Sequence, residues 1–127
     1  MIEEQFNINI LSDDPIFCTS LASECNKFGF SLTFFKEEDI GDEKNINSNM
    51  ISVNIIDLDI LDSDPYDIAR KLRITSNSPI FGVFNQFNKQ LQAKAKKTGY
   101  DLVFTKSMLI KSVKKIIIHV SNEKRNL

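Results

Sequence analysis

Three short apolar segments of the chain are each followed by charged residues. Asp13 and Asp14 follow the first, Asp57 follows the second and Lys106 follows the third. The segments are 7–12, 51–56 and 102–105. If they are neighbouring parallel strands, their carboxyl ends meet at one edge of a sheet, where open α/β sheets place ligands and chemistry. Carboxylates suit a divalent cation and a lysine suits phosphoryl oxygens, so the pattern predicts phosphoryl chemistry at this edge.

The composition describes one globular domain and excludes several classes of function. A chain of 127 residues is long enough for one hydrophobic core and too short for two. Its formal net charge of −1 gives no basis for binding nucleic acid or a membrane surface. No apolar stretch reaches the ~20 residues that cross a bilayer. Glu3 and Glu4 exclude the basic start of a signal peptide.

The two cysteines are predicted to be reduced. Cys18 and Cys25 lie seven residues apart in one expected helix, which separates their Cα atoms by roughly 10 Å. A disulfide tolerates about 7 Å. Reduced, half-buried thiols of this kind indicate a cytoplasmic protein.

Strand and helix signals alternate along the chain. Five segments have the apolar character of strands: 6–12, 30–35, 51–56, 80–84 and 101–105. Asp14 and Asp64 each precede a proline, which predicts an N-cap followed by the first helical residue. Gly29 is suited to end the first of these helices.

The apolar positions predict which helix faces turn inward. In the first helix they are Ile16, Phe17, Leu21, Cys25 and Phe28. In the helix after Pro65 they are Ile68, Ala69 and Leu72. A further helix is expected near 89–98, and Ser107 is expected to cap a last one. That last helix would turn inward Leu109, Ile110, Val113, Ile116, Ile117 and Val120.

Strict alternation predicts a doubly wound α/β fold, with a five-stranded parallel sheet and five helices. The weakest segment is 36–50, which is polar and is expected to hold a short helix between loops. Residues 1–121 are expected to form the domain. Residues 122–127 are expected to form a polar, disordered C-terminal tail.

The order and spacing of these residues resemble the receiver domain of bacterial response regulators, over essentially the whole chain. The segment 55–64 is similar to the family's phosphoacceptor segment, with Asp57 at the acceptor position. Gly99 precedes Lys106 by seven residues, and the spacing within 15–29 also matches. The resemblance implies a flavodoxin-like fold, a regulatory role rather than an enzymatic one, and a phosphoryl group accepted on Asp57.

The resemblance also implies a metal site. Asp13 and Asp57 would bind Mg²⁺ directly, with the backbone carbonyl of Asp59 as a third ligand, and Lys106 would contact the phosphoryl oxygens. The family's first acidic position falls on Ser12, which reduces the acidic pair to Asp13 and weakens the expected Mg²⁺ site. Asp14 would compensate only by turning inward, whereas its sequence context commits it to the N-cap.

The positions that report phosphorylation in the family are altered here. Phe84 occupies the position, at the end of the fourth strand, where the family has a hydroxyl residue, and Asn85 occupies the next position, where the family has a small residue. Val103 occupies the family's aromatic switch position, and Ser107 replaces the proline that follows the lysine in the family. A phenyl group is expected in the place of the hydroxyl. A cis bond before serine would cost ~3 kcal/mol, so the loop at Ser107 is expected to differ from the family's.

The residues favour three functions to different degrees. The first is a stand-alone receiver domain in two-component phosphorelay signalling, phosphorylated by a histidine kinase or phosphotransfer protein. The second is a receiver-like interaction module that does not signal through phosphorylation, which the altered switch positions favour. The third, a flavin- or nucleotide-binding protein, is disfavoured because no glycine-rich phosphate loop follows the first strand and 12–15 would repel phosphate.

The expected partners are proteins. A downstream protein would dock on the face of the last two helices, where seven lysines gather, although a solvated face is the simpler explanation of these lysines. They are Lys89, Lys94, Lys96, Lys97, Lys111, Lys114 and Lys115. The chain is expected to be a monomer or a weak homodimer.

Overall fold

The structure, a computed structural model, describes residues 5–40 and 50–125. Its strands are β1 Gln5–Leu11, β2 Ser31–Phe34, β3 Met50–Asp57, β4 Ile80–Phe84 and β5 Leu102–Thr105. Its helices are α1 Pro15–Phe28, α2 Pro65–Thr75, α3 Lys89–Lys97 and α4 Lys106–Arg125, with a 3-10 turn η1 at Glu37–Asp39. None of the described helices is long and apolar enough to cross a membrane.

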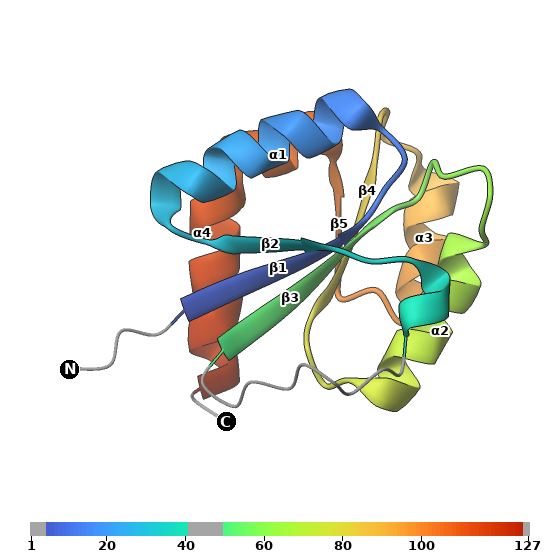
Figure 1. The fold of residues 1–127 in the computed structure, drawn as a ribbon. Helices are drawn as coiled ribbons and strands as arrows, with labels where there is room; N and C mark the ends of the chain where they lie inside the picture. Colours follow the sequence, from blue (N-terminus) through green and yellow to red (C-terminus); the bar gives the residue numbers. More distant parts are fainter. Residues whose placement is uncertain (1–4, 41–49, 126–127) are drawn as a thin grey trace.

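All five strands form one parallel sheet in the order β2-β1-β3-β4-β5. Helices α1 and α4 cover one face and α2 and α3 cover the other (Figure 1). The predicted doubly wound α/β fold is therefore confirmed. The strand order places β1 and β3 side by side in the middle of the sheet, with β4 and β5 following on one side.

The strand register brings the predicted chemical residues to one edge. Leu11, the last residue of β1, pairs with Ile56, and Asp57 pairs with Val83 in β4. Thr105, the last residue of β5, pairs with Phe84. The residues that follow β1, β3 and β5 therefore emerge at the same carboxyl end of the sheet.

The helix ends follow the predicted local chemistry. The Asp14 side chain accepts the backbone N–H groups of Ile16 and Phe17, and the Asp64 side chain caps α2 in the same way. Gly29 ends α1 with a φ of 73°, a left-handed conformation that glycine adopts without strain. These caps fix the points at which the chain leaves the sheet edge.

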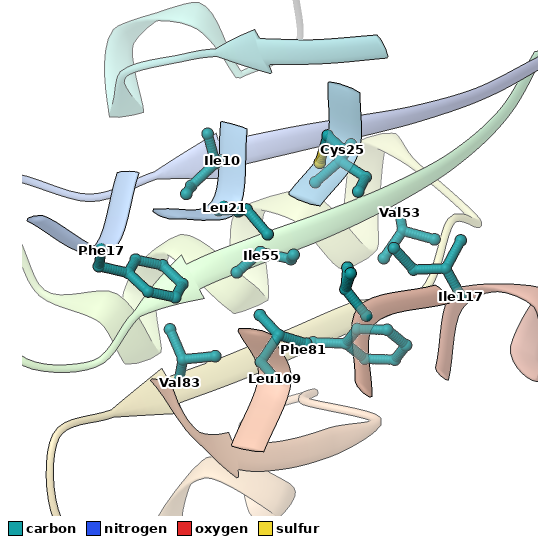
Figure 2. Close-up of a cluster of buried hydrophobic side chains, with 12 residues drawn as sticks. Ile10, Phe17, Leu21, Cys25, Val53, Ile55, Phe81, Val83, Leu109 and Ile117 are labelled. Carbon is teal, nitrogen blue, oxygen red and sulfur yellow. The ribbon is translucent and has the colours of Figure 1, made fainter. Parts of the chain in front are cut away.

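The core consists of two apolar clusters, one on each face of the sheet. The cluster beneath α1 and α4 contains Phe17, Leu21 and Cys25 together with Leu109 and Ile117 (Figure 2). Val113 of α4 belongs to the same cluster. The cluster beneath α2 and α3 contains Ile68, Ala69 and Leu72, as predicted, together with Phe84 and Tyr100. Both thiols are free, which agrees with the expectation of reduced cysteines.

Several expectations about the helices need correction. Ile16 is 79% exposed rather than part of the inner stripe, because the buried positions of α1 follow the four-residue spacing of Phe17, Leu21 and Cys25. Phe28 is also exposed. In α4, Ile110 and Ile116 pack against the core cluster, as predicted, although they are only partly buried. The Val120 side chain lies outside the described ones.

Helix α4 begins earlier and ends later than expected. It starts at Lys106, and Thr105 Oγ1 accepts the Met108 N–H at 3.2 Å, so Thr105 takes the capping role predicted for Ser107. The helix continues to Arg125, which corrects the expected disorder directly after Ser121. The division into a domain and a tail stays a prediction.

The segment 36–50 was expected to hold a fifth helix. Its described part contains only the 3-10 turn η1, and residues 41–49 lie outside the described ranges. No described peptide bond is cis, so the bond before Ser107 is trans, in agreement with the different loop expected there.

Candidate functional site

A buried ion pair lies at the carboxyl edge of the sheet. Lys106 Nζ is 2.9 Å from Asp57 Oδ2. Asp57 is 0% exposed and Lys106 is 7% exposed. Charges that leave water this completely need partners, because an isolated buried charge is very costly. Asp57 and Lys106, which are 49 residues apart in the sequence, thus form one unit.

The Asp57 carboxylate is held by three donors. Oδ2 accepts the Ser12 hydroxyl at 2.7 Å in addition to the Lys106 ammonium. Oδ1 accepts the backbone N–H of Asp59 at 2.9 Å. Both oxygens therefore have hydrogen-bond partners, which explains how a fully buried carboxylate is accommodated. The carboxylate is oriented by β1, by the loop after β3 and by α4.

The Lys106 ammonium lies among three carboxylates. Asp14 Oδ2 is 3.1 Å away and Asp59 Oδ2 is 3.7 Å away, in addition to Asp57. Burial disfavours the charged ammonium, but the hydrogen bonds to Asp57 and Asp14 outweigh it and raise the pKa of Lys106. The Phe17 ring, 5.6 Å from Nζ, covers the ammonium on the apolar side. Lys106 is therefore the cationic centre of the cluster.

Asp14 has two roles, one on each carboxylate oxygen. Its Oδ1 accepts the N–H groups of Ile16 and Phe17, and its Oδ2 accepts Lys106. The Phe17 N–H, followed by Lys106, holds the pKa of Asp14 below its usual value. The expectation that capping would keep Asp14 out of the site is therefore wrong, because one carboxylate has oxygens for both tasks.

Asp13 and Asp59, the other two predicted metal ligands, differ in their contacts. The Asp13 side chain is exposed, and the described part of the chain offers it no hydrogen bond or ion pair. Its role as a ligand stays a prediction. Asp59 Oδ2 accepts the backbone N–H of Asn85 at 2.7 Å, which ties the loop after β3 to the loop after β4.

The two altered switch positions lie on the opposite face of the sheet. Phe84 is 1% exposed and belongs to the cluster beneath α2 and α3, and Val103 packs against the same cluster. Asp57 follows Ile56 and therefore points to the other face, because side chains alternate along a strand. The Phe84 phenyl group fills core space beneath α2 and α3. That it takes the place of the family's hydroxyl stays a prediction.

Comparison with known proteins identifies solved structures that share this architecture. No protein-family model matches the chain, and no curated protein sequence does. Among solved structures, the receiver domain of the TMAO respiratory response regulator TorR aligns with a TM-score of 0.72 at 18% identity, over 95% of this chain and 98% of that one. The chain has the receiver fold. A receiver domain from Rhodospirillum rubrum agrees, with a TM-score of 0.71, 13% identity and 91% and 93% coverage.

A third match shows a partner of a receiver domain. It is a chain in the co-crystal structure of the Saccharomyces cerevisiae histidine phosphotransfer protein Ypd1 with the receiver domain of Ssk1. The TM-score is 0.73 at 17% identity, over 92% of this chain and 89% of that one. At such identities the likeness establishes the receiver fold, while the chemistry of the site has to be argued from its residues.

The receiver fold implies Mg²⁺, and the donor chemistry of the site suits it. Asp14, Asp57 and Asp59 direct carboxylate oxygens toward one point, and Mg²⁺ prefers such oxygens. That point is the Lys106 ammonium. In the described ranges no group of three or more His, Cys, Asp or Glu side chains is arranged to hold a metal ion. A metal would therefore compete with Lys106 for the same carboxylates.

Asp57 and Lys106 are predictable from the sequence, whereas the contribution of Ser12 is not part of that prediction. Ser12 was expected only as the loss of a carboxylate, but its hydroxyl donates directly to Asp57. A signal was present, because a small polar residue at the end of β1 lies beside the end of β3. A hydroxyl there can reach a carboxylate that follows the neighbouring strand.

Proposed function

We propose that this chain is a receiver-type signalling domain in which Asp57 accepts a phosphoryl group from a histidine kinase or a histidine phosphotransfer protein. One observation carries the proposal: a fully buried carboxylate and a lysine ammonium, 2.9 Å apart, at the carboxyl edge of a parallel sheet. An exposed aspartate that only caps a loop would need no such partner. The pair supplies a nucleophile together with a charge that stabilises transferred phosphoryl oxygens.

The transfer is a substitution at phosphorus. An Asp57 oxygen attacks the phosphorus atom, an O–P bond forms and the N–P bond of the donor breaks. The leaving nitrogen keeps the electron pair of that bond and takes up a proton. Lys106 compensates the charge of the transferred oxygens, and Asp59 N–H keeps the other carboxylate oxygen in place.

Asp57, with Asp14 or Asp13 and the Asp59 carbonyl, would hold Mg²⁺. When bound, the ion neutralises part of the charge on the transferring oxygens. Lys106 limits how strongly these carboxylates can bind it. We therefore expect Mg²⁺ binding that is weak in the resting protein.

The domain acts by protein–protein contact rather than as an enzyme in this proposal. The seven lysines of α3 and α4 are exposed, and a downstream protein with an acidic surface would be attracted to these two helices. The phosphodonor instead has to reach the edge at which Asp57 lies. Donor and downstream partner would thus contact different parts of the domain.

A second function, an interaction module that does not signal through phosphorylation, is favoured by two observations. The Lys106 ammonium already pairs with Asp14, Asp57 and Asp59 and offsets part of their negative charge. Phe84 has no hydroxyl and Val103 has no aromatic ring, so the two positions do not supply the hydroxyl and aromatic pair that reports phosphorylation in the family. In this function the ion pair would serve only to stabilise the fold.

Intact-mass measurement separates the two functions. The protein is incubated with Mg²⁺ and excess acetyl phosphate, and its mass is recorded over time. The first function predicts a gain of one phosphoryl group that Asp57→Asn abolishes and that Asp62→Asn, a change of an exposed loop carboxylate, preserves. Absence of any gain at saturating donor would refute phosphoryl acceptance and leave the interaction module.

A further inference from the structure

The Ser12 hydroxyl contacts the same carboxylate oxygen as Lys106. Ser12 Oγ donates to Asp57 Oδ2 at 2.7 Å and accepts the backbone N–H of Asp14 at 3.1 Å. The accepted hydrogen bond orients the oxygen, so that the hydroxyl proton is directed at Asp57. Within the described part of the chain, no other side-chain hydroxyl forms a hydrogen bond with this carboxylate.

The end of β4 offers no alternative donor. Phe84 carries no polar atom and lies in the apolar cluster on the other face of the sheet. The Asn85 backbone N–H is engaged by Asp59 Oδ2. The donors that reach Asp57 Oδ2 are therefore Ser12, directly after β1, and Lys106, at the start of α4.

We propose that Ser12 donates its hydroxyl hydrogen bond to the phosphoryl group on Asp57, and that the start of α1 reports this change. The proposal rests on the proposed function. When Asp57 Oδ2 forms the O–P bond and the N–P bond of the donor breaks, the negative charge moves from the carboxylate to the phosphoryl oxygens. Ser12 and Lys106 follow the charge, because both are already directed at the attacking atom.

The hydrogen bonds of Ser12 and Asp14 connect this event to α1. The Asp14 N–H is bonded to Ser12 Oγ, and Asp14 Oδ1 holds the first N–H groups of the helix, those of Ile16 and Phe17. Asp14 Oδ2 is also paired with Lys106. When Lys106 moves to the phosphoryl oxygens, its ion pair with Asp14 weakens. When Ser12 turns toward the phosphoryl group, it also displaces the Asp14 backbone N–H that is bonded to its hydroxyl oxygen.

The first turn of α1 therefore receives both changes. It carries Ile16, an apolar side chain that is 79% exposed and contributes nothing to the core. An exposed apolar residue at the responding turn can contact a partner differently in the two states. The readout is thus placed at the end of β1 and the start of α1, rather than at β4 and β5.

The test compares four proteins: wild type, Ser12→Ala, Ser12→Thr and Ser20→Ala. Ser12→Thr keeps the hydroxyl. Ser20→Ala is the matched control, since it deletes a serine hydroxyl of α1 that forms no hydrogen bond within the described ranges. Each protein is treated with Mg²⁺ and acetyl phosphate, with mass uptake recorded and the amide NMR signals of Ile16 and Phe17 followed.

We expect Ser12→Ala to slow phosphoryl uptake by about tenfold or more, the effect of losing one hydrogen bond to a charged group. The Ile16 and Phe17 amide signals should shift on phosphorylation in wild type, Ser12→Thr and Ser20→Ala, and stay unmoved in Ser12→Ala. A role limited to folding would change the resting spectrum without removing the phosphorylation-dependent shift.

Two results overturn the proposal in distinguishable ways. If wild type takes up phosphoryl groups and Ser12→Ala matches it in rate and in amide shifts, the role of Ser12 is refuted and Asp57 remains the acceptor. If wild type takes up none, the proposed function and the role of Ser12 both fall.

Discussion

Replacing Lys106 by methionine tests whether the buried ion pair governs this site. Lys106→Met keeps an apolar stem beside Phe17 and removes the ammonium, which leaves the fully buried Asp57 without its counter-charge. Removing one partner of a buried ion pair typically costs about 3–5 kcal/mol. Asp57 keeps its hydrogen bonds from Ser12 and Asp59, so we expect the lower end, about 3 kcal/mol.

Urea unfolding followed by circular dichroism measures this cost. With an m-value of about 2 kcal/mol/M, the midpoint should fall by roughly 1.5 M. Lys71→Met is the matched control, because Lys71 also contacts two carboxylates, Glu37 at 3.0 Å and Asp67 at 3.3 Å, but lies at the surface. Its midpoint should stay close to that of wild type, since exposed pairs contribute little.

A double variant separates uncompensated charge from lost packing. Asp57→Asn combined with Lys106→Met replaces the buried carboxylate with a neutral amide, so the double variant should be more stable than Lys106→Met alone. If Lys106→Met costs less than about 1 kcal/mol, or if the double variant is no more stable, the ion pair is not the principal polar interaction of the site and the reasoning fails.

Three further predictions follow from the same contacts. Asp14→Asn keeps a capping oxygen but cannot ionise. Because the pKa of Asp14 is lowered in the folded state, the unfolding free energy of wild type should fall more than that of this variant between about pH 5 and pH 2. An equal dependence of the unfolding free energy on pH in the two proteins would contradict the lowered pKa of Asp14. Burial raises the pKa of Cys25 to about 11, so in native protein it should react with iodoacetamide far more slowly than half-buried Cys18, and equal rates would contradict that burial. Lys106→Met should bind Mg²⁺ at least about tenfold more tightly by calorimetry, and weaker binding would show that the ammonium does not compete with the ion.

Most of the fold that positions the site can be predicted from the sequence, because the ends of strands and the caps of helices are marked by local residue patterns. Asp57 and Lys106 lie at the carboxyl ends of apolar strands. Parallel pairing brings these ends to one edge of the sheet in any order of the strands. Asp14 before Pro15 predicts a helix start that the structure confirms.

Properties that depend on side-chain direction were harder to predict. Asp14 and Asp13 are neighbours in sequence, yet Asp14 joins Lys106 and Asp13 faces solvent, a difference set by how the chain turns into α1. Phe84 ends the strand next to Asp57 but lies one position out of phase with it and enters the opposite core cluster. Ile16 is apolar and exposed, because hydrophobicity alone does not place a residue at the end of a helix.

The central claim is that Asp57 is a phosphoacceptor, and chemical trapping at this residue tests it most directly. The protein is treated with Mg²⁺ and acetyl phosphate, reduced with borohydride, digested and analysed by mass spectrometry, with a chelator-treated sample as the control. An acyl phosphate on Asp57 is reduced to homoserine, so the account predicts homoserine at position 57, dependent on the donor and diminished by the chelator. Unmodified aspartate at position 57 in a protein that remains folded would contradict it.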